Sequence, residues 1–236
     1  MKRDLLFELN KTQKSNWVIL ILAGLVQLVF LYFFTVVGRF EPSSKEDILS
    51  DYRGITGLSS AVTVCILVIY GTVLINRLIV SNYIGDNRLR LYLYPSGRGK
   101  LYLIKNIAFV ISFSVYQLIG ILIGNLIYLF GEYYFPVLVS PVPISTYWPE
   151  FISSAIICTL LTLSIVLLSS IVGIKMSSPV ATVVSGIVLI TLCGNLMAVS
   201  FFQSQNFTFV VVMLTFLLAC AGIIMSAFRI NKDEVL

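Results

Sequence analysis

The first membrane-length segment of the chain is WVILILAGLVQLVFLYFFTVV, residues Trp17–Val37. It contains no charged residue, and its 21 residues would extend about 30 Å as an α-helix, which matches the hydrocarbon core of a bilayer. The segment is too long for the apolar part of a cleaved signal peptide and lacks a small-x-small cleavage site. It therefore predicts a membrane-spanning helix.

The rest of the chain repeats this pattern of charge-free stretches. Three of them have 23 to 26 residues, and a fourth has 53 residues, enough for two helices separated at Gln203–Asn206. We predict an all-α integral membrane protein with six transmembrane helices, at about 17–37, 58–80, 106–130, 150–172, 179–200 and 207–228. Residues Tyr133–Pro149 contain four of the seven prolines and are predicted to form a loop on the membrane surface, because spanning helices do not accommodate that density of proline.

Composition agrees with a polytopic membrane protein. Hydrophobic residues make up 58% of the chain and charged residues 11%, whereas soluble domains average about a quarter charged. Histidine is absent, which excludes Ser-His and Cys-His catalysis and histidine-ligated metals. The four cysteines fall in four different predicted helices without metal-binding spacing, so we expect inert thiols and no metal site. They are Cys65, Cys158, Cys193 and Cys220.

Basic residues are distributed unevenly between the two predicted sides of the membrane. Thirteen lysines and arginines fall on the side of both termini, and three fall on the other side. The positive-inside rule therefore places both termini in the cytoplasm. The net charge of +5 is attributed to this topology and to contact with anionic lipids, not to nucleic-acid binding.

The predicted spans hold no ionisable side chain in their interior, which argues against proton- or ion-coupled transport. The chain also lacks a phosphate-binding loop with Walker A spacing; Ser96–Lys100 has the glycine and the lysine but not the pattern. We therefore expect a chain that is not itself an enzyme. Any energy for its work would come from another chain.

The one long cytoplasmic connection, Asn82–Lys105, is strongly basic. Residues Arg88–Tyr94 alternate with period 2, with a leucine at every second position, which fits a strand, but a lone strand at a membrane surface would leave its backbone unpaired. We therefore favour a short interfacial helix with leucines and tyrosines at the headgroup boundary. The alternative is a basic loop that only enforces topology.

This loop, the six spans, the cytoplasmic termini and the basic amphipathic segment Met1–Asn16 together resemble the ABC-2 family of ABC-transporter permease subunits. Residues Leu91–Arg98 and Lys105-Asn106 match the Leu-Pro-x-Ser-Arg and lysine portions of that family's loop between spans 2 and 3. Asp86-Asn87 stands where the family commonly has Gly-Thr, and the family's usual upstream glutamate is missing at Asn82-Tyr83.

The resemblance implies that the loop forms a coupling helix, which docks on a separate ATPase subunit that binds ATP and Mg. It also implies pairing with a second permease, identical or related, and a surface position for Met1–Asn16. The coupling residues would be Arg88, Leu89, Arg90, Leu91, Leu93, Pro95, Ser96 and Arg98. Small permeases of this family that resemble this chain often export membrane-active peptides or give immunity to them.

Apolar spans favour an amphipathic peptide cargo. Alternatives are a multidrug or lipid exporter and a six-helix substrate-capture subunit of an energy-coupling-factor importer, which would lack the coupling loop. An intramembrane hydrolase is disfavoured because the spans have neither a histidine nor a carboxylate.

Uncharged polar and small residues within the spans are the remaining candidate site residues. The amides Gln27, Gln117, Asn125 and Asn195 would either bond to neighbouring helices, which we favour, or line a substrate path. Gly120-x-x-x-Gly124 and Thr182-x-x-x-Gly186 predict close helix contacts. Because the family pairs across spans 1 and 5, Thr182 and Gly186 are assigned to the dimer seam.

Overall fold

The computed structural model describes residues 2–40, 52–85, 97–134, 144–203 and 205–232, with side chains at 4–10, 15–40, 53–85, 97–134, 148–194 and 207–231. Every regular element in these ranges is helical. The elements are α1 (Lys2–Phe40), α2 (Tyr52–Leu78), the short 3-10 helix η2 (Val80–Asn82), α4 (Arg98–Tyr134), α5 (Ile144–Lys175), α6 (Pro179–Gln203) and α7 (Gln205–Lys232). The predicted all-α class is confirmed for this part of the chain.

Within the described residues, five segments are long and apolar enough to cross a membrane: Ser15–Phe40, Arg53–Asn82, Arg98–Tyr134, Trp148–Lys175 and Phe207–Asn231. A sixth helix, α6, is apolar over the shorter segment Pro179–Gly194. Five to six apolar helices indicate a membrane-embedded protein. The exact count of six spans stays a prediction.

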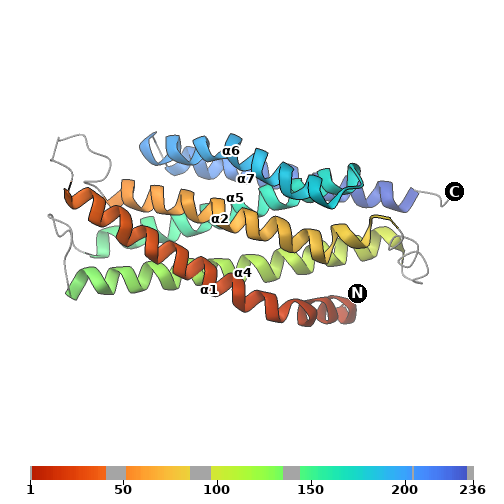
Figure 1. The fold of residues 1–236 in the computed structure, drawn as a ribbon, viewed down its shortest axis with the longest axis horizontal. Coiled ribbons are helices and arrows are strands. Elements are labelled where there is room, and N and C mark those ends of the chain that lie inside the picture. Colours follow the sequence, from red (N-terminus) through yellow and green to blue (C-terminus); the bar gives the residue numbers. More distant parts are fainter. Residues whose placement is uncertain (1, 41–51, 86–96, 135–143, 204, 233–236) are drawn as a thin grey trace.

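The helices run side by side along the long axis of the molecule (Figure 1). The beginning of α1 and the end of α7 lie at the same end of this bundle, and the end of α2 and the beginning of α4 lie there too (Figure 1). The arrangement agrees with an even number of spans. That this end faces the cytoplasm stays a prediction from the distribution of basic residues.

The predicted surface loop at Tyr133–Pro149 is wrong at both of its ends. Helix α4 continues to Tyr134, and α5 begins at Ile144 with Pro149 inside it. The first four backbone N–H groups of a helix have no partner within it, so a proline close to the helix start disturbs few backbone bonds. Pro149 lies one and a half turns into α5 and removes a single backbone bond. Residues 135–143 lie outside the described part of the chain.

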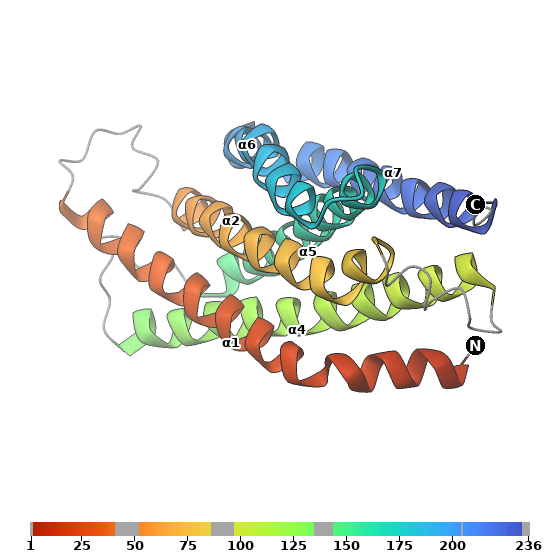
Figure 2. The same cartoon turned by 45° about the vertical axis from the view of Figure 1, so that its right-hand side comes forward.

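The predicted surface segment Met1–Asn16 is helical from Lys2 and is continuous with the first span, because α1 is one helix of 39 residues; its position at the membrane surface stays a prediction. No glycine or proline occurs before Gly24, so nothing in the sequence ends the helix before the span begins. Figure 2 shows that α1 changes direction between its N-terminal part and the rest. At this junction Ser15 Oγ lies 3.3 Å from the Tyr70 hydroxyl of α2, and Trp17 meets the ring of Tyr116 of α4 edge to face.

Helix α5 is the centre of the bundle and contacts α2, α4, α6 and α7. Its buried polar residues are serines and threonines, whose hydroxyls bond to backbone carbonyls three or four positions earlier in the same helix. A hydroxyl satisfied within its own helix can be buried without a partner on another helix. Because these side chains are small, four other helices can pack closely around α5.

Candidate functional site

Helices α1 and α4 cross closely at Gly120 and Gly124, the small-residue pair of α4. A Cβ atom added at Gly124 would lie 2.7 Å from the carbonyl oxygen of Gly24, and one added at Gly120 would lie 2.6 Å from that of Leu20. No side chain fits at either position, so the two backbones are in direct contact. The close helix contact predicted from Gly120-x-x-x-Gly124 is confirmed, with α1 as the partner.

Beside this crossing, a buried hydrogen-bond network joins four helices. Gln27 Nε2 of α1 donates to Asn125 Oδ1 of α4 at 3.1 Å and to Ser59 Oγ of α2 at 3.3 Å. Thr63 Oγ1 of α2 donates to Gln27 Oε1 at 2.7 Å, and Asn125 Nδ2 donates to the carbonyl oxygen of Phe151 in α5 at 3.5 Å. All these polar side chains are buried, so the network fixes the relative positions of α1, α2, α4 and α5.

A second buried amide, Gln117, lies two turns before Asn125 on α4, about 12 Å away along the helix axis. Its Nε2 donates to Thr162 Oγ1 of α5 at 3.0 Å and lies 3.9 Å from Cys158 Sγ. Among the described residues, nothing donates to its Oε1, although the side chain is fully buried. An unsatisfied buried acceptor costs about 1–3 kcal/mol, so Gln117 is held less favourably than the amides of the first network.

Three of the four predicted amides therefore form hydrogen bonds between helices, as we favoured from the sequence. Their role in a substrate path stays a prediction, and the side chain of Asn195 lies outside the described residues. The hydroxyl partners Ser59, Thr63 and Thr162 were not predicted from the sequence. The first two are one helical turn apart on α2 and so share a face, a spacing that could have marked them as partners of an amide.

Thr182 and Gly186 of α6 face the interior of this chain, and their assignment to a dimer seam is corrected. Thr182 is fully buried against Gly173 near the end of α5, where no additional Cβ atom fits. A Cβ atom added at Gly186 would lie 2.5 Å from Thr72 Cγ2 of α2. The predicted close approach exists, but its partners are helices of the same chain.

Most of the predicted coupling residues, Arg88, Leu89, Arg90, Leu91, Leu93, Pro95 and Ser96, lie outside the described residues. Arg98 is the first residue of α4. The two ends of the connection are held together, because the buried rings of Tyr83 and Tyr102 meet edge to face with centroids 5.2 Å apart. A Cβ atom added at Gly99 would lie 2.6 Å from the carbonyl oxygen of Ala227, so the start of α4 is in contact with α7.

No family model, curated protein or solved structure matches the chain. In the described ranges, no group of three or more histidine, cysteine, aspartate or glutamate side chains is arranged to hold a metal ion. The four cysteines are free thiols, and Cys158 is completely buried among α2, α4 and α5.

The network predicts an energetic coupling between Gln27 and Asn125. Replacing either residue with leucine should destabilise the protein, but replacing both should cost less than the sum, because each single change leaves the other amide without its partner. The interaction energy in a double-mutant cycle should be about 0.6–1.7 kcal/mol, between the average and the largest values for hydrogen bonds between membrane helices. Unfolding in mixed micelles measures it.

The control for this cycle is Gln117, which shares no hydrogen-bond partner with Gln27. Gln27→Leu combined with Gln117→Leu should be additive within about 0.5 kcal/mol. If the Gln27 and Asn125 changes are equally additive, the network does not contribute to stability in the way the geometry indicates.

Proposed function

We propose that this chain is the membrane-spanning permease subunit of an ATP-driven ABC exporter of the ABC-2 type, in a bacterial plasma membrane. The observation that carries the proposal is the basic connection between α2 and α4. It carries five lysines and arginines within Asn82–Lys105 and joins two helix ends that lie beside both chain termini (Figure 1). A separate ATPase subunit with ATP and Mg bound would dock on this connection.

Both ends of the connection are held by contacts with other helices, which supports a role in coupling. The contact between Tyr83 and Tyr102 holds the two ends together, and the contact of Gly99 with Ala227 holds the start of α4 against α7. A force applied to the connection would therefore move α2, α4 and α7 together instead of being absorbed by a loose linker. Transmission of this kind needs elements that move as rigid bodies.

A complete exporter would contain two permeases and two ATPase subunits. Closure of the ATPases on ATP would draw the coupling loops together and change the relative positions of the helix pairs. The second permease, identical or related, would need an exposed apolar face. Helix α1 presents one, with exposed side chains at four-residue spacing: Trp17, Ile21, Leu25, Val29 and Phe33.

The cargo we propose is an amphipathic peptide, handled for toxin export or self-immunity. The buried amides already bond to one another and to hydroxyls, and the spans have no charged residue in their interior to hold a small ion or a nucleotide. An apolar surface binds by burying apolar area, at about 25 cal/mol per Å². A multidrug or lipid exporter and an energy-coupling-factor substrate-capture subunit are the alternatives.

The test compares a strain lacking this chain with its parent. The deletion should raise sensitivity to amphipathic membrane-active peptides and their build-up inside the cell, and a tagged chain should copurify with a Walker A ATPase. The purified chain alone should hydrolyse no ATP, whereas the complex should.

Two outcomes would redirect the proposal. If peptide sensitivity and build-up do not change while efflux of lipophilic dyes falls, the cargo is a drug and not a peptide. If no ATPase copurifies and uptake of a small nutrient falls instead, the chain is a substrate-capture subunit and the exporter assignment is wrong.

A further inference from the structure

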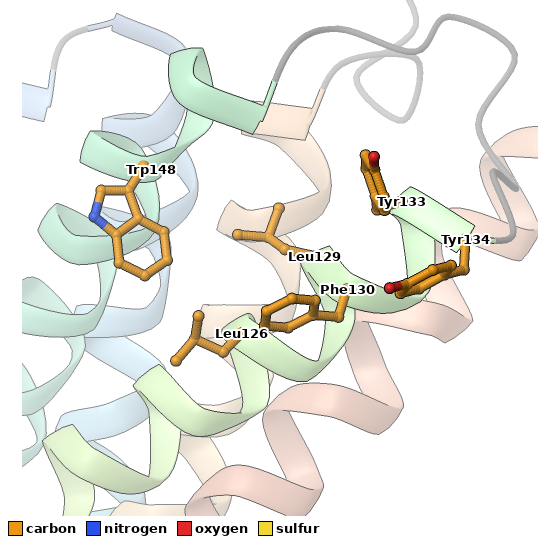
Figure 3. A pocket seen from close by; sticks show the side chains of 6 residues that line it. All are labelled: Leu126, Leu129, Phe130, Tyr133, Tyr134 and Trp148. Carbon is orange, nitrogen blue, oxygen red and sulfur yellow. The ribbon is translucent and has the colours of Figure 1, made fainter.

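A pocket of about 370 Å³ lies between the end of α4 and the start of α5 (Figure 3). This volume is within the range of small-molecule sites, about 300–1,000 Å³. Figure 3 shows Trp148 of α5 on one side of the pocket and the side chains of α4 on the other. The lining residues are Leu126, Leu129, Phe130, Tyr133, Tyr134 and Trp148.

The chemistry of the lining is apolar, with polar atoms only at its aromatic members. None of the six residues is charged, and the side-chain polar atoms are the hydroxyls of Tyr133 and Tyr134 and the indole N–H of Trp148. Phe130, Tyr133 and Tyr134 are each more than 60% exposed, so the protein leaves much of this aromatic surface uncovered. Such a site suits a ligand with an apolar chain and a hydrogen-bond acceptor at one end.

The surface that leads to the pocket identifies the class of ligand. Side chains exposed at every fourth position of α4 form an apolar stripe: Ile111, Val115, Ile119, Ile123 and Ile127. This stripe continues into the pocket through Phe130. In a membrane such a stripe faces lipid chains, and tyrosine and tryptophan gather where the chains meet the headgroups. The pocket thus continues the lipid-facing surface at the level of the headgroups, at the end of the bundle opposite both termini (Figure 1).

The wall formed by Trp148 is well anchored, as a binding site requires. The two residues that follow Pro149 are both engaged: Glu150 pairs with Arg53 of α2 at 2.5 Å, and the carbonyl oxygen of Phe151 accepts from Asn125 Nδ2 of α4. The turn of α5 that carries Trp148 is therefore tied to α2 and to the buried amide network. The indole is held by this turn across the pocket from α4.

We propose that this pocket binds one phospholipid, with an acyl chain against Leu126, Leu129 and Phe130. Its ester and phosphate oxygens accept hydrogen bonds from the tyrosine hydroxyls, and the Trp148 ring packs against the acyl chain from the other side. The absence of charge in the lining means that a zwitterionic lipid such as phosphatidylcholine suffices. The proposal is independent of the transport function above, because it requires only that the chain is embedded in a membrane.

Trp148 itself can report the binding. The chain has two tryptophans, so Trp17→Phe leaves Trp148 as the only one. The purified variant, freed of lipid in detergent, is titrated with phosphatidylcholine that carries bromine on an acyl chain, because bromine in contact with an indole quenches its fluorescence. We expect saturable quenching at about one lipid per chain.

Variants of the lining test the position of the lipid. Leu126→Phe fills part of the pocket and should raise the lipid concentration for half-quenching about tenfold, and Phe130→Ala, at an exposed position, should also raise it without disturbing the core. The matched control is Ile119→Phe, which makes an exposed change on the same stripe of α4 outside the pocket. It should leave half-quenching within about twofold.

Three results would overturn the proposal. Quenching that rises linearly with lipid and is the same in all variants would mean general partitioning without a site. A shift of Trp148 emission caused by an added amphipathic peptide and abolished by Leu126→Phe, without saturable lipid quenching, would assign the pocket to a peptide. A dimer that Leu126→Phe converts to a monomer would assign it to a second copy of the chain.

Discussion

Replacing Gly124 with leucine should separate α1 from α4 and lower the free energy of unfolding by about 3 kcal/mol or more. Even a single added carbon at this position would lie 2.7 Å from the carbonyl oxygen of Gly24, and backbone cannot move aside as a flexible side chain can. The added Cβ would also lie 3.4 Å from Gln27 Cβ, so the displacement would reach the hydrogen bond between Gln27 and Asn125. Unfolding in mixed micelles measures the loss.

Alanine variants provide the matched comparison. Gly124→Ala should destabilise by about 1–3 kcal/mol, since the methyl group already meets backbone. Gly194→Ala in α6 should be neutral or stabilise by up to about 1 kcal/mol, because an added Cβ there meets no atom within 4 Å and alanine favours the helix. Equal stabilities for the two alanine variants would show that α1 and α4 do not approach each other through these glycines.

The helices were predictable from the sequence, but their ends were not. The span predicted at residues 106–130 is part of a helix that runs from Arg98 to Tyr134. Hydropathy marks the part of a helix that lies in hydrocarbon, whereas basic and aromatic residues at its ends can stay at the interface while the backbone remains helical. The continuity of α1 was missed for the same reason.

The candidate site was predictable as a set of residues but not as a set of contacts. An amide within an apolar span must find a partner, and Gln27, Gln117 and Asn125 do. A small-x-x-x-small pair predicts a close approach without naming the other helix. For Gly120 and Gly124 the partner is α1, and for Thr182 and Gly186 the partners are α5 and α2 of the same chain, which overturns the assignment to a dimer seam.

Replacing Arg88, Arg90 and Arg98 with glutamate should detach the ATPase and abolish transport, if the proposed coupling role is correct. The variant replaces three positive charges of the connection with three negative ones. An acidic groove on the ATPase would repel these charges, and a hydrogen-bonding groove would lose its arginine donors. The loss of charged contacts at an interface costs several kcal/mol, so copurified ATPase should fall by more than about tenfold. ATPase recovery on a tagged chain and accumulation of the peptide in cells are the two measurements.

The control for this variant reverses three basic charges elsewhere on the same predicted side: Lys175, Arg229 and Lys232 to glutamate. It produces the same change in net charge but should leave copurification intact. Insertion is checked with Ser96→Cys in a cysteine-free background, which should react with an impermeant thiol reagent only after permeabilisation, whereas Ser43→Cys and Ser140→Cys should react from outside. If the coupling-loop variant is correctly inserted and still binds the ATPase and transports, the basic connection only enforces topology, and the docking role is wrong.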